Sequence, residues 1–249
     1  MSDRWFDGTY YKREITVNYM DCNTDKKVFL HYMLGIFSEI AGDECQAKGQ
    51  THDFFVNHGK IFLLTRMSIR FHKTPKWDDT VIFTTWFRTT EGKFFLRDCE
   101  MRAPDGELFA SASSTWALID PVEHKVLDPD EYPGSRSCGF KQKADSPECK
   151  KIISESPLPV IGYRPVYYTD LDCNHHVNNS VYSKIATDFL PPEYRSRDLF
   201  DFVINFNKET KLGETLEIRG AETEDGYIIQ GSCDGNQHFA CEFTFKNNK

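Results

Sequence analysis

The stretch that decides the fold is Asp172-Cys173-Asn174-His175-His176-Val177-Asn178-Asn179, together with the helical pattern that follows it. Over residues 179–190 an apolar stripe recurs at every fourth position, which predicts a helix, and two consecutive prolines then predict its end. An extended segment would place Asp172, Asn174 and His176 on one face, because side chains alternate there. A carboxylate, a carboxamide and an imidazole beside the amides of a helix N-terminus predict a reactive site.

The chain contains an earlier copy of this plan. The same triplet occurs at Asp21-Cys22-Asn23, and apolar periodicity predicts a helix from about residue 29 to residue 48. After each helix come two segments that alternate like strands, at residues 69–74 and 79–83 in the first half and 204–209 and 214–218 in the second. Each half is therefore predicted to be a long helix followed by an antiparallel sheet, an α+β fold built by duplication.

A segment rich in Pro, Gly, Ser and Lys separates the two copies. It covers residues 128–159 and shows no clear periodicity, which is typical of a linker. The sequence thus predicts an N-terminal domain at residues 1–127, this linker, and a C-terminal domain at residues 160–249.

Composition excludes several classes of function. The 249 residues are 39% hydrophobic and 14% aromatic, enough for one large domain or two ordinary ones. The net charge of −8 disfavours nucleic-acid binding. No apolar run approaches the roughly 18 residues of a membrane span, and no secretory signal is visible. The eight cysteines form no Cys-x-x-Cys pair, which favours reduced thiols in a cytoplasmic protein over paired disulfides.

The two copies differ at the positions that carry chemistry. If the triplets are aligned, His176 corresponds to Asp25, and the strand register pairs Glu209 with Thr74. Structural requirements act on both copies alike, so a group present in only one copy is the better candidate for catalysis. His176 and Glu209 are such groups. The Asp and Asn of the second triplet have counterparts in the first, so a structural role is the alternative for both.

Four segments form a pattern that spans most of the chain: Asp172-x-Asn174-x-His176-Val177-Asn178-Asn179-x-x-Tyr182, Phe206-Asn207-Lys208-Glu209, Leu96-Arg97-Asp98 and Ser113-Ser114-Thr115-Trp116. This pattern closely resembles the acyl-acyl carrier protein thioesterases, whose single chain holds two hotdog domains, each a long helix wrapped by an antiparallel sheet. The resemblance implies that fatty acid is released from acyl carrier protein without a metal or bound cofactor. It implies a catalytic set of Asp172, Asn174, His176 and Glu209. Plant members often carry Cys after the glutamate, and Thr210 here disfavours a cysteine nucleophile at that place.

Thioester hydrolysis requires an activated water, a positioned carbonyl and a stabilised oxyanion. We expect Glu209 to act as general base, although direct attack through an anhydride stays open. Asn174 is expected to hold the water or the carbonyl, and His176 to orient the same water or donate to the departing sulfur. Backbone amides at residues 176–179 are the expected oxyanion donors. Asp172 is expected to orient a neighbour or cap the helix.

The first half is expected to hold the fatty chain. Candidate tunnel residues are Met33, Phe37, Ile40 and Trp116, with a plain core role as the alternative for each. The acidic carrier protein would dock on basic side chains, for which the candidates are Arg195, Arg197, Lys141, Lys143, Lys150 and Lys151, and a solvated surface is the alternative. Two hotdogs in one chain already form a dimer-like unit, so a monomer or homodimer is expected. The short segment before the first domain favours a bacterial cytosolic enzyme.

Other functions stay open at the level of sequence. They are an acyl-CoA thioesterase, a hotdog-type dehydratase or hydratase, and an acyl-binding module without catalysis, which the lack of a first-half glutamate disfavours. A nucleophilic pair of Cys173 with His176 is disfavoured, because the two side chains would point oppositely in an extended run. Adjacent His175 and His176 are poorly placed to share one metal ion.

Overall fold

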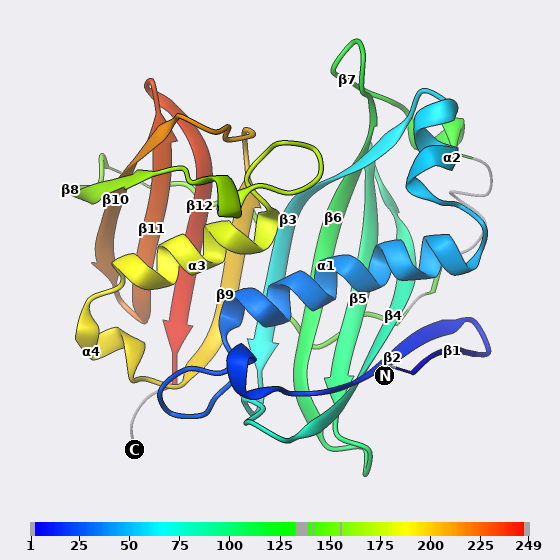
Figure 1. Cartoon of the computed structure of the whole chain (residues 1–249), viewed down its shortest axis with the longest axis horizontal. Coiled ribbons are helices and arrows are strands. Elements are labelled where there is room, and N and C mark those ends of the chain that lie inside the picture. The colour runs from blue at the N-terminus through cyan, green and yellow to red at the C-terminus, as the bar shows by residue number, and fades with distance from the viewer. Residues whose placement is uncertain (1–2, 133–138, 141, 155, 247–249) are drawn as a thin grey trace.

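The computed structural model describes residues 3–132, 139–140, 142–154 and 156–246. Its strands form one antiparallel sheet in the order β1-β2-β4-β5-β6-β3-β9-β12-β11-β10-β8, with β7 paired to β6 (Figure 1). The strands are β1 (Arg4–Asp7), β2 (Tyr10–Thr16), β3 (Ile61–Phe71), β4 (Thr80–Glu91), β5 (Phe94–Arg102), β6 (Leu108–Asp120), β7 (Lys125–Val126), β8 (Val160–Pro165), β9 (Leu199–Phe206), β10 (Thr215–Thr223), β11 (Gly226–Cys233) and β12 (Asn236–Phe245). The helices are α1 (Leu30–Ala47), α2 (His52–Asn57), α3 (Asn179–Phe189) and α4 (Pro192–Arg195).

Each half places one main helix against its part of the sheet, which confirms the predicted α+β arrangement. Helices α1 and α3 lie on the same face, α1 over the first half and α3 over the second (Figure 1). The buried face of α1 carries Met33, Leu34, Phe37 and Ile40, spaced as an apolar stripe must be to face a sheet. Among the described residues, no helix is long and apolar enough to cross a membrane.

The two halves meet where β3 pairs with β9. Met67 lies opposite Ile204 and Ile69 opposite Phe202, and all four side chains are buried in the same core. At the edge of this pairing the Arg70 guanidinium donates two hydrogen bonds of 2.9 Å to the Asp201 carboxylate. The sheet is therefore continuous across the boundary between the halves.

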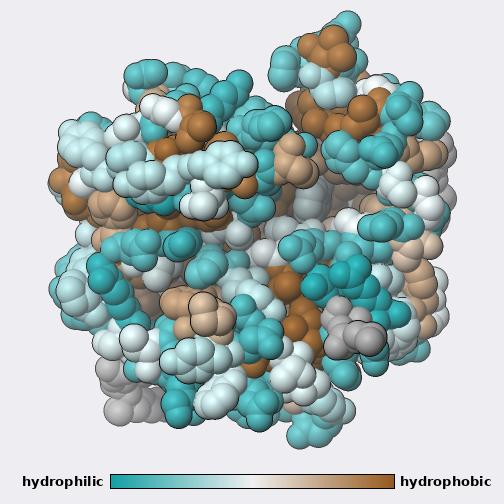
Figure 2. Space-filling model, viewed as in Figure 1, coloured by the Kyte–Doolittle hydropathy of each residue, from teal (hydrophilic) through white to brown (hydrophobic). Residues whose placement is uncertain are grey.

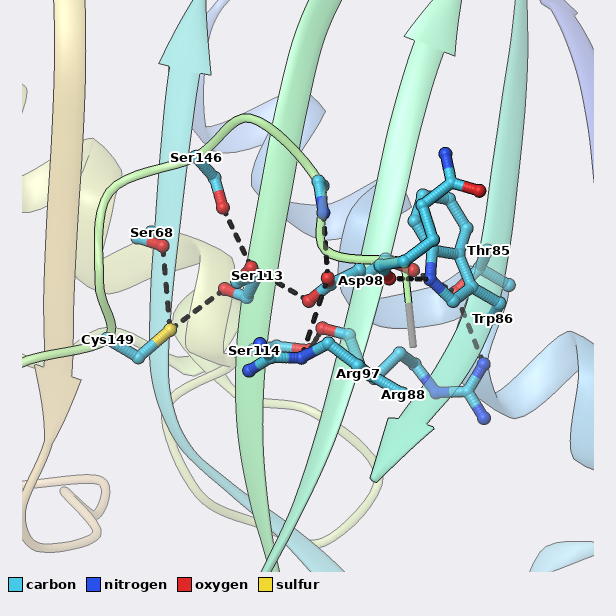
Figure 3. A network of polar contacts seen from close by, with 12 residues as sticks. Ser68, Thr85, Trp86, Arg88, Arg97, Asp98, Ser113, Ser114, Ser146 and Cys149 are labelled. Atoms are coloured by element: carbon cyan, nitrogen blue, oxygen red, sulfur yellow. Dashed lines mark hydrogen bonds and ion pairs between the residues drawn. The ribbon is translucent and has the colours of Figure 1, made fainter. Parts of the chain in front are cut away.

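Residues 142–154 of the segment that joins the halves run across the sheet face opposite the helices (Figure 3). Along β3 the side chains of Met67 and Ile69 face the core with α1, so Ser68 between them faces the other side. There the Ser68 hydroxyl donates to the Pro147 carbonyl at 2.6 Å. Further along, the Asn205 side chain accepts from the Ile152 amide at 2.8 Å and donates to the Lys150 carbonyl at 3.0 Å. This part of the predicted linker is thus held to the sheet by polar contacts. The division at residues 128–159 stays a prediction.

Asp98 on β5 is the centre of these contacts (Figure 3). Its buried carboxylate accepts hydrogen bonds from the Ser113 hydroxyl at 2.8 Å and the Ala144 amide at 2.9 Å, and Arg88 Nε lies 3.6 Å away. Burial raises the pKa of the Asp98 carboxyl, while the Ala144 amide, the Ser113 hydroxyl and the Arg88 charge act in the opposite direction. The buried Asp98 carboxylate therefore links β5 by hydrogen bonds to β6 and to the linker.

We expect Asp98→Ala to lower the free energy of unfolding by about 3 kcal/mol, because it leaves the buried Ala144 amide without its acceptor and the Arg88 charge without its carboxylate. Chemical denaturation measures this loss. Glu91→Ala removes an exposed carboxylate at the end of β4 and serves as the charge-matched control. Equal free energies of unfolding in the two variants would mean that the Asp98 contacts with the linker do not stabilise the fold.

Candidate active site

Two loops of the second half meet at one end of the sheet. One loop precedes α3 and the other follows β9, and they lie beside each other in Figure 1. The Val177 amide donates to the Thr210 carbonyl at 2.9 Å, and His176 and Lys211 form an isolated antiparallel bridge. This backbone link brings the histidine of the first loop to the glutamate of the second.

The first loop is a tight turn and not the extended run on which the sequence argument relied. The Asp172 carboxylate accepts from the Asn174 amide at 2.8 Å, and the Asp172 amide donates to the His176 carbonyl at 2.8 Å. His175 completes the turn in the left-handed region, with φ of 63°, and its side chain is exposed. Asp172, Asn174 and His176 nevertheless line one cavity, so the turn brings together what alternation was expected to align.

The His176 and Glu209 side chains are in direct contact at the mouth of these two loops. His176 Nε2 lies 3.1 Å from Glu209 Oε2, and the side chains are 27% and 46% exposed. Both line the cavity with Asp172 and Asn174. The four residues that the sequence singled out therefore border the same space, and an imidazole and a carboxylate in contact are equipped for proton transfer.

The cavity has a volume of about 1620 Å³ and is lined by residues of both halves. In the first half its wall includes a cluster of packed aromatic rings, with centroids 5.0–6.1 Å apart: Phe55, Phe62, Phe95 and Tyr132. On the surface, apolar residues gather around β7 and α2, beside a hollow that separates them from the second half (Figure 2). The site thus combines a polar end in the second half with an apolar wall in the first.

The predicted tunnel residues fall in two groups. Trp116 lines the cavity, and its indole donates to the Ser114 hydroxyl at 2.9 Å. Met33, Phe37 and Ile40 lie in the core between α1 and the sheet and are not among the lining residues. The aromatic cluster was missed, although the abundance of Phe and the Phe-rich segments at α2 and β3 were signals for it.

The five basic docking candidates that the structure describes are not among the residues that line the cavity. Arg195 donates to the carbonyls of Asp188 and Leu190 at the end of α3, and Lys150 pairs with Glu242 at 2.7 Å. Arg197 lies over two aromatic rings, Lys143 and Lys151 are exposed, and Lys141 lies outside the described residues. The lysines that do line the second-half part of the cavity are Lys208 and Lys211, on either side of Glu209 and Thr210. Neither lysine is among the docking candidates predicted from the sequence.

The internal repeat is real, but the triplets are not equivalent. A short 3-10 helix occurs at Tyr19–Asp21 and at Tyr168–Asp170, and left-handed residues follow at Lys26 and His175. Isolated bridges join Cys22 to Val28 and Leu171 to Val177. This hydrogen-bond pattern aligns Asn23 with Asp172, two residues away from the alignment of the triplets. The recurrence of Asp-Cys-Asn is therefore a coincidence of sequence.

The corrected register changes the counterparts of the site. His176 corresponds to Lys27 and not to Asp25, because both bridge to the equivalent lysines Lys211 and Lys76. The predicted pairing of Glu209 with Thr74 is correct. The backbone amide of Lys208, just before Glu209, donates to the His238 carbonyl, and the amide of Lys73, just before Thr74, donates to the Phe109 carbonyl. The first half thus lacks both the imidazole and the carboxylate.

Asp172 has a structural counterpart in Asn23. The Asn23 side chain accepts from the amides of Asp25 and Lys27 at 2.9 and 3.0 Å, as Asp172 accepts from the Asn174 amide. Asn178, and not Asp172, caps α3, because its side chain accepts from the Ser180 amide at 2.9 Å. Cys173 is exposed, and the described residues contain no group of three side chains arranged to hold a metal ion.

Two family models match the chain, the acyl-ACP thioesterase N-terminal domain over residues 8–132 and the acyl-ACP thioesterase C-terminal domain over residues 161–247. The chain belongs to the acyl-ACP thioesterase family. Among curated relatives of this family, a chloroplastic acyl-[acyl-carrier-protein] hydrolase of Cuphea viscosissima is 23% identical over 85% of this chain and 54% of its own length. A palmitoyl-acyl carrier protein thioesterase of Arabidopsis thaliana is 25% identical over 87% of this chain and 56% of its own length. The chain spans about half the length of the curated relatives it matches.

Solved structures of family members share the fold. An acyl-ACP thioesterase from Bacteroides thetaiotaomicron matches with a TM-score of 0.87 at 17% identity, covering 96% of this chain and 98% of that one. The 12:0-ACP thioesterase from Umbellularia californica matches with a TM-score of 0.84 at 17% identity, covering 97% and 99%. The prediction of tandem hotdog domains is confirmed.

Because Asn23 closes the equivalent turn in the first half, the turn at Asp172 is predicted to need a side-chain oxygen as acceptor and not a negative charge. We expect Asp172→Asn to leave the free energy of unfolding within about 0.5 kcal/mol of the parent, because an amide oxygen accepts the same bond. Asp172→Ala should cost about 1 kcal/mol. Chemical denaturation of both variants measures the difference, and a loss in Asp172→Asn equal to that in Asp172→Ala would show that the turn requires the charge.

Proposed function

We propose that this chain hydrolyses the thioester of fatty acyl-acyl carrier protein, releasing free fatty acid and ending chain elongation. The observation that carries the proposal is the 3.1 Å approach of His176 Nε2 to Glu209 Oε2 at the polar end of a cavity that continues into an apolar half. Family membership supports it, as do the activities in the names of the relatives, which are acyl-carrier-protein hydrolases.

Glu209 is the proposed general base. Its half-exposed carboxylate is open to water, and the His176 imidazole contacts one of its oxygens, which leaves the other to accept a proton from the attacking water. Protonated at Nε2, His176 donates to that carboxylate and fixes its direction. The departing thiol has a pKa of roughly 8.5 and leaves readily as a thiolate, so proton donation to sulfur contributes little.

The oxyanion that forms on the carbonyl needs donors at the same end of the cavity. The amides of Val177 and Asn178 already donate to the carbonyls of Thr210 and Asp170. Asn179 begins α3, where the amides of the first turn have no acceptor within the helix, and it lines the cavity. We therefore assign the oxyanion to the Asn179 amide, because the Ser180 and Val181 amides that follow already donate to Asn178. The Asn174 carboxamide, which also lines the cavity, holds the water or the carbonyl.

The substrate lies across both halves. The acyl chain occupies the first-half part of the cavity against the aromatic cluster and Trp116, because apolar surface removed from water stabilises a bound hydrocarbon. The phosphopantetheine arm of the carrier protein enters from the polar end, where Lys208 and Lys211 lie. The protein acts in the cytoplasm as a monomer or homodimer, on a protein partner and not on nucleic acid, in keeping with its net charge of −8.

The test compares matched acyl chains carried by acyl carrier protein and by coenzyme A, with product analysis. We expect release of free fatty acid and a higher kcat/KM on the carrier-protein substrate. A large preference for coenzyme A would assign an acyl-CoA thioesterase. Addition of water across a double bond with the thioester intact would assign a hydratase, and bound lipid without turnover an acyl-binding module.

We expect His176→Ala and Glu209→Ala each to lower kcat at least about 100-fold, because each removes one member of the proton-transferring pair. Both side chains are partly exposed, so circular dichroism should show folded proteins. Cys173→Ala is the control, since this exposed thiol takes no part in the mechanism. Near-parental rates in Glu209→Ala would remove it as the base, and an inactive but folded Cys173→Ala would reinstate a thiol nucleophile.

A further inference from the structure

We infer that a buried hydrogen-bonded chain of Tyr182, Thr210 and His238 positions Glu209 for its contact with His176. This inference rests on the proposed function of the same site. Tyr182 comes from α3, Thr210 from the loop after β9 and His238 from β12, and all three side chains are buried. They are positioning residues, because they act on Glu209 through the backbone of Thr210.

Every polar atom of Thr210 is engaged. Its amide donates to the Tyr182 hydroxyl at 3.1 Å, and its carbonyl accepts from the Val177 amide at 2.9 Å. Its hydroxyl lies 2.9 Å from the Tyr182 hydroxyl and 2.7 Å from His238 Nδ1. Thr210 follows Glu209 directly and is tied to the residue after His176. Fixing Thr210 thus fixes the backbone from which the half-exposed Glu209 side chain reaches His176.

Each of the three hydrogen bonds in this chain has its own donor proton in one arrangement only. The Thr210 amide donates to the Tyr182 oxygen, the Tyr182 hydroxyl donates to Thr210 Oγ1, and the Thr210 hydroxyl donates to His238 Nδ1. Nδ1 must therefore carry no proton. Burial lowers the pKa of His238, aided by the Lys208 charge and opposed by Glu214 and Asp234, so the imidazole is neutral near pH 7. Its Nε2 is buried and has no hydrogen-bond partner among the described residues.

The first half shows that the fold does not need this chain. In the corrected register, Met33 is the equivalent of Tyr182, because α1 begins at Leu30 and α3 at Asn179. Pro75 and Phe109 are the equivalents of Thr210 and His238, because their carbonyls accept the same backbone hydrogen bonds. The Pro75 carbonyl accepts from the Val28 amide at 2.9 Å, as the Thr210 carbonyl accepts from Val177. The same loop contact forms with three apolar residues. The polar chain occurs only in the half that carries His176 and Glu209.

Two substitutions that each delete one hydroxyl test the inference, Thr210→Val and Tyr182→Phe. We expect each to lower kcat on acyl-carrier-protein substrate by roughly 10- to 100-fold, because a displaced base loses its alignment with the water, while KM changes less than about twofold. Thr210→Ser keeps the hydroxyl and should retain parental kcat. Thr187→Val on α3 and Tyr194→Phe on α4 delete comparable hydroxyls elsewhere and should leave kcat unchanged.

Parental kcat in Thr210→Val and Tyr182→Phe would overturn the inference, as would equal losses in Thr210→Ser and Thr210→Val. A readout without activity separates it from the proposed function. Nitrogen NMR of His238 in the parent protein at pH 7 should show a neutral ring protonated at Nε2, and Thr210→Val should shift the Nδ1 resonance. A ring protonated at Nδ1 would overturn the chain even if the enzyme hydrolyses thioesters. Absence of hydrolysis with the expected NMR result would overturn the proposed function alone.

Discussion

The antiparallel pairing of β3 with β9 is the constraint on which the site depends. Because the strands run in opposite directions, β9 ends where Arg66 in the middle of β3 lies opposite Asn205, and the start of β3 extends past that end. The start of β3 carries Phe62 and Leu64, which line the apolar part of the cavity, and the end of β9 leads directly into Glu209. One strand pair therefore joins the two halves of the sheet and sets the apolar wall of the cavity next to the proposed base. Neither half contains this juxtaposition by itself.

The repeat separates the part of the site that both halves share from the part that only the second half has. Both halves make the same turn, the same bridge and the same helix start, and in both an Asn or Asp side chain closes the turn. The halves differ in what they attach to that backbone. Lys27 stands where the second half has His176, and Thr74 where it has Glu209. The proposed chemistry thus lies on a turn whose geometry is maintained by backbone hydrogen bonds common to both copies.

The sequence predicted the fold well because periodicity reports which faces are buried. Helix 29–48 was observed at Leu30–Ala47, and the strand register that pairs Glu209 with Thr74 holds. The alignment of the two helix starts was wrong by two residues. It relied on the repeated Asp-Cys-Asn triplet, whereas the true alignment follows from backbone hydrogen bonds that the sequence does not show. The four catalytic candidates do border one cavity, although through a tight turn and not an extended run. Their roles stay predictions.

The cavity lining was harder to predict, because a helix has more than one buried face. The apolar stripe with Met33, Phe37 and Ile40 packs into the core, as strong periodicity generally indicates. The cavity meets other residues of α1, including Glu44, which is buried and paired with Arg97 of β5 and Lys48. Burial acts to raise the pKa of Glu44, but the Arg97 and Lys48 charges outweigh it and the pKa is lowered. A buried carboxylate is tolerable only with such partners, and that pairing joins residues too distant in sequence for any local pattern to reveal. A cavity wall made of paired charges and aromatic rings therefore depends on tertiary contacts that local sequence patterns do not show, whereas the core can be predicted from hydrophobic periodicity.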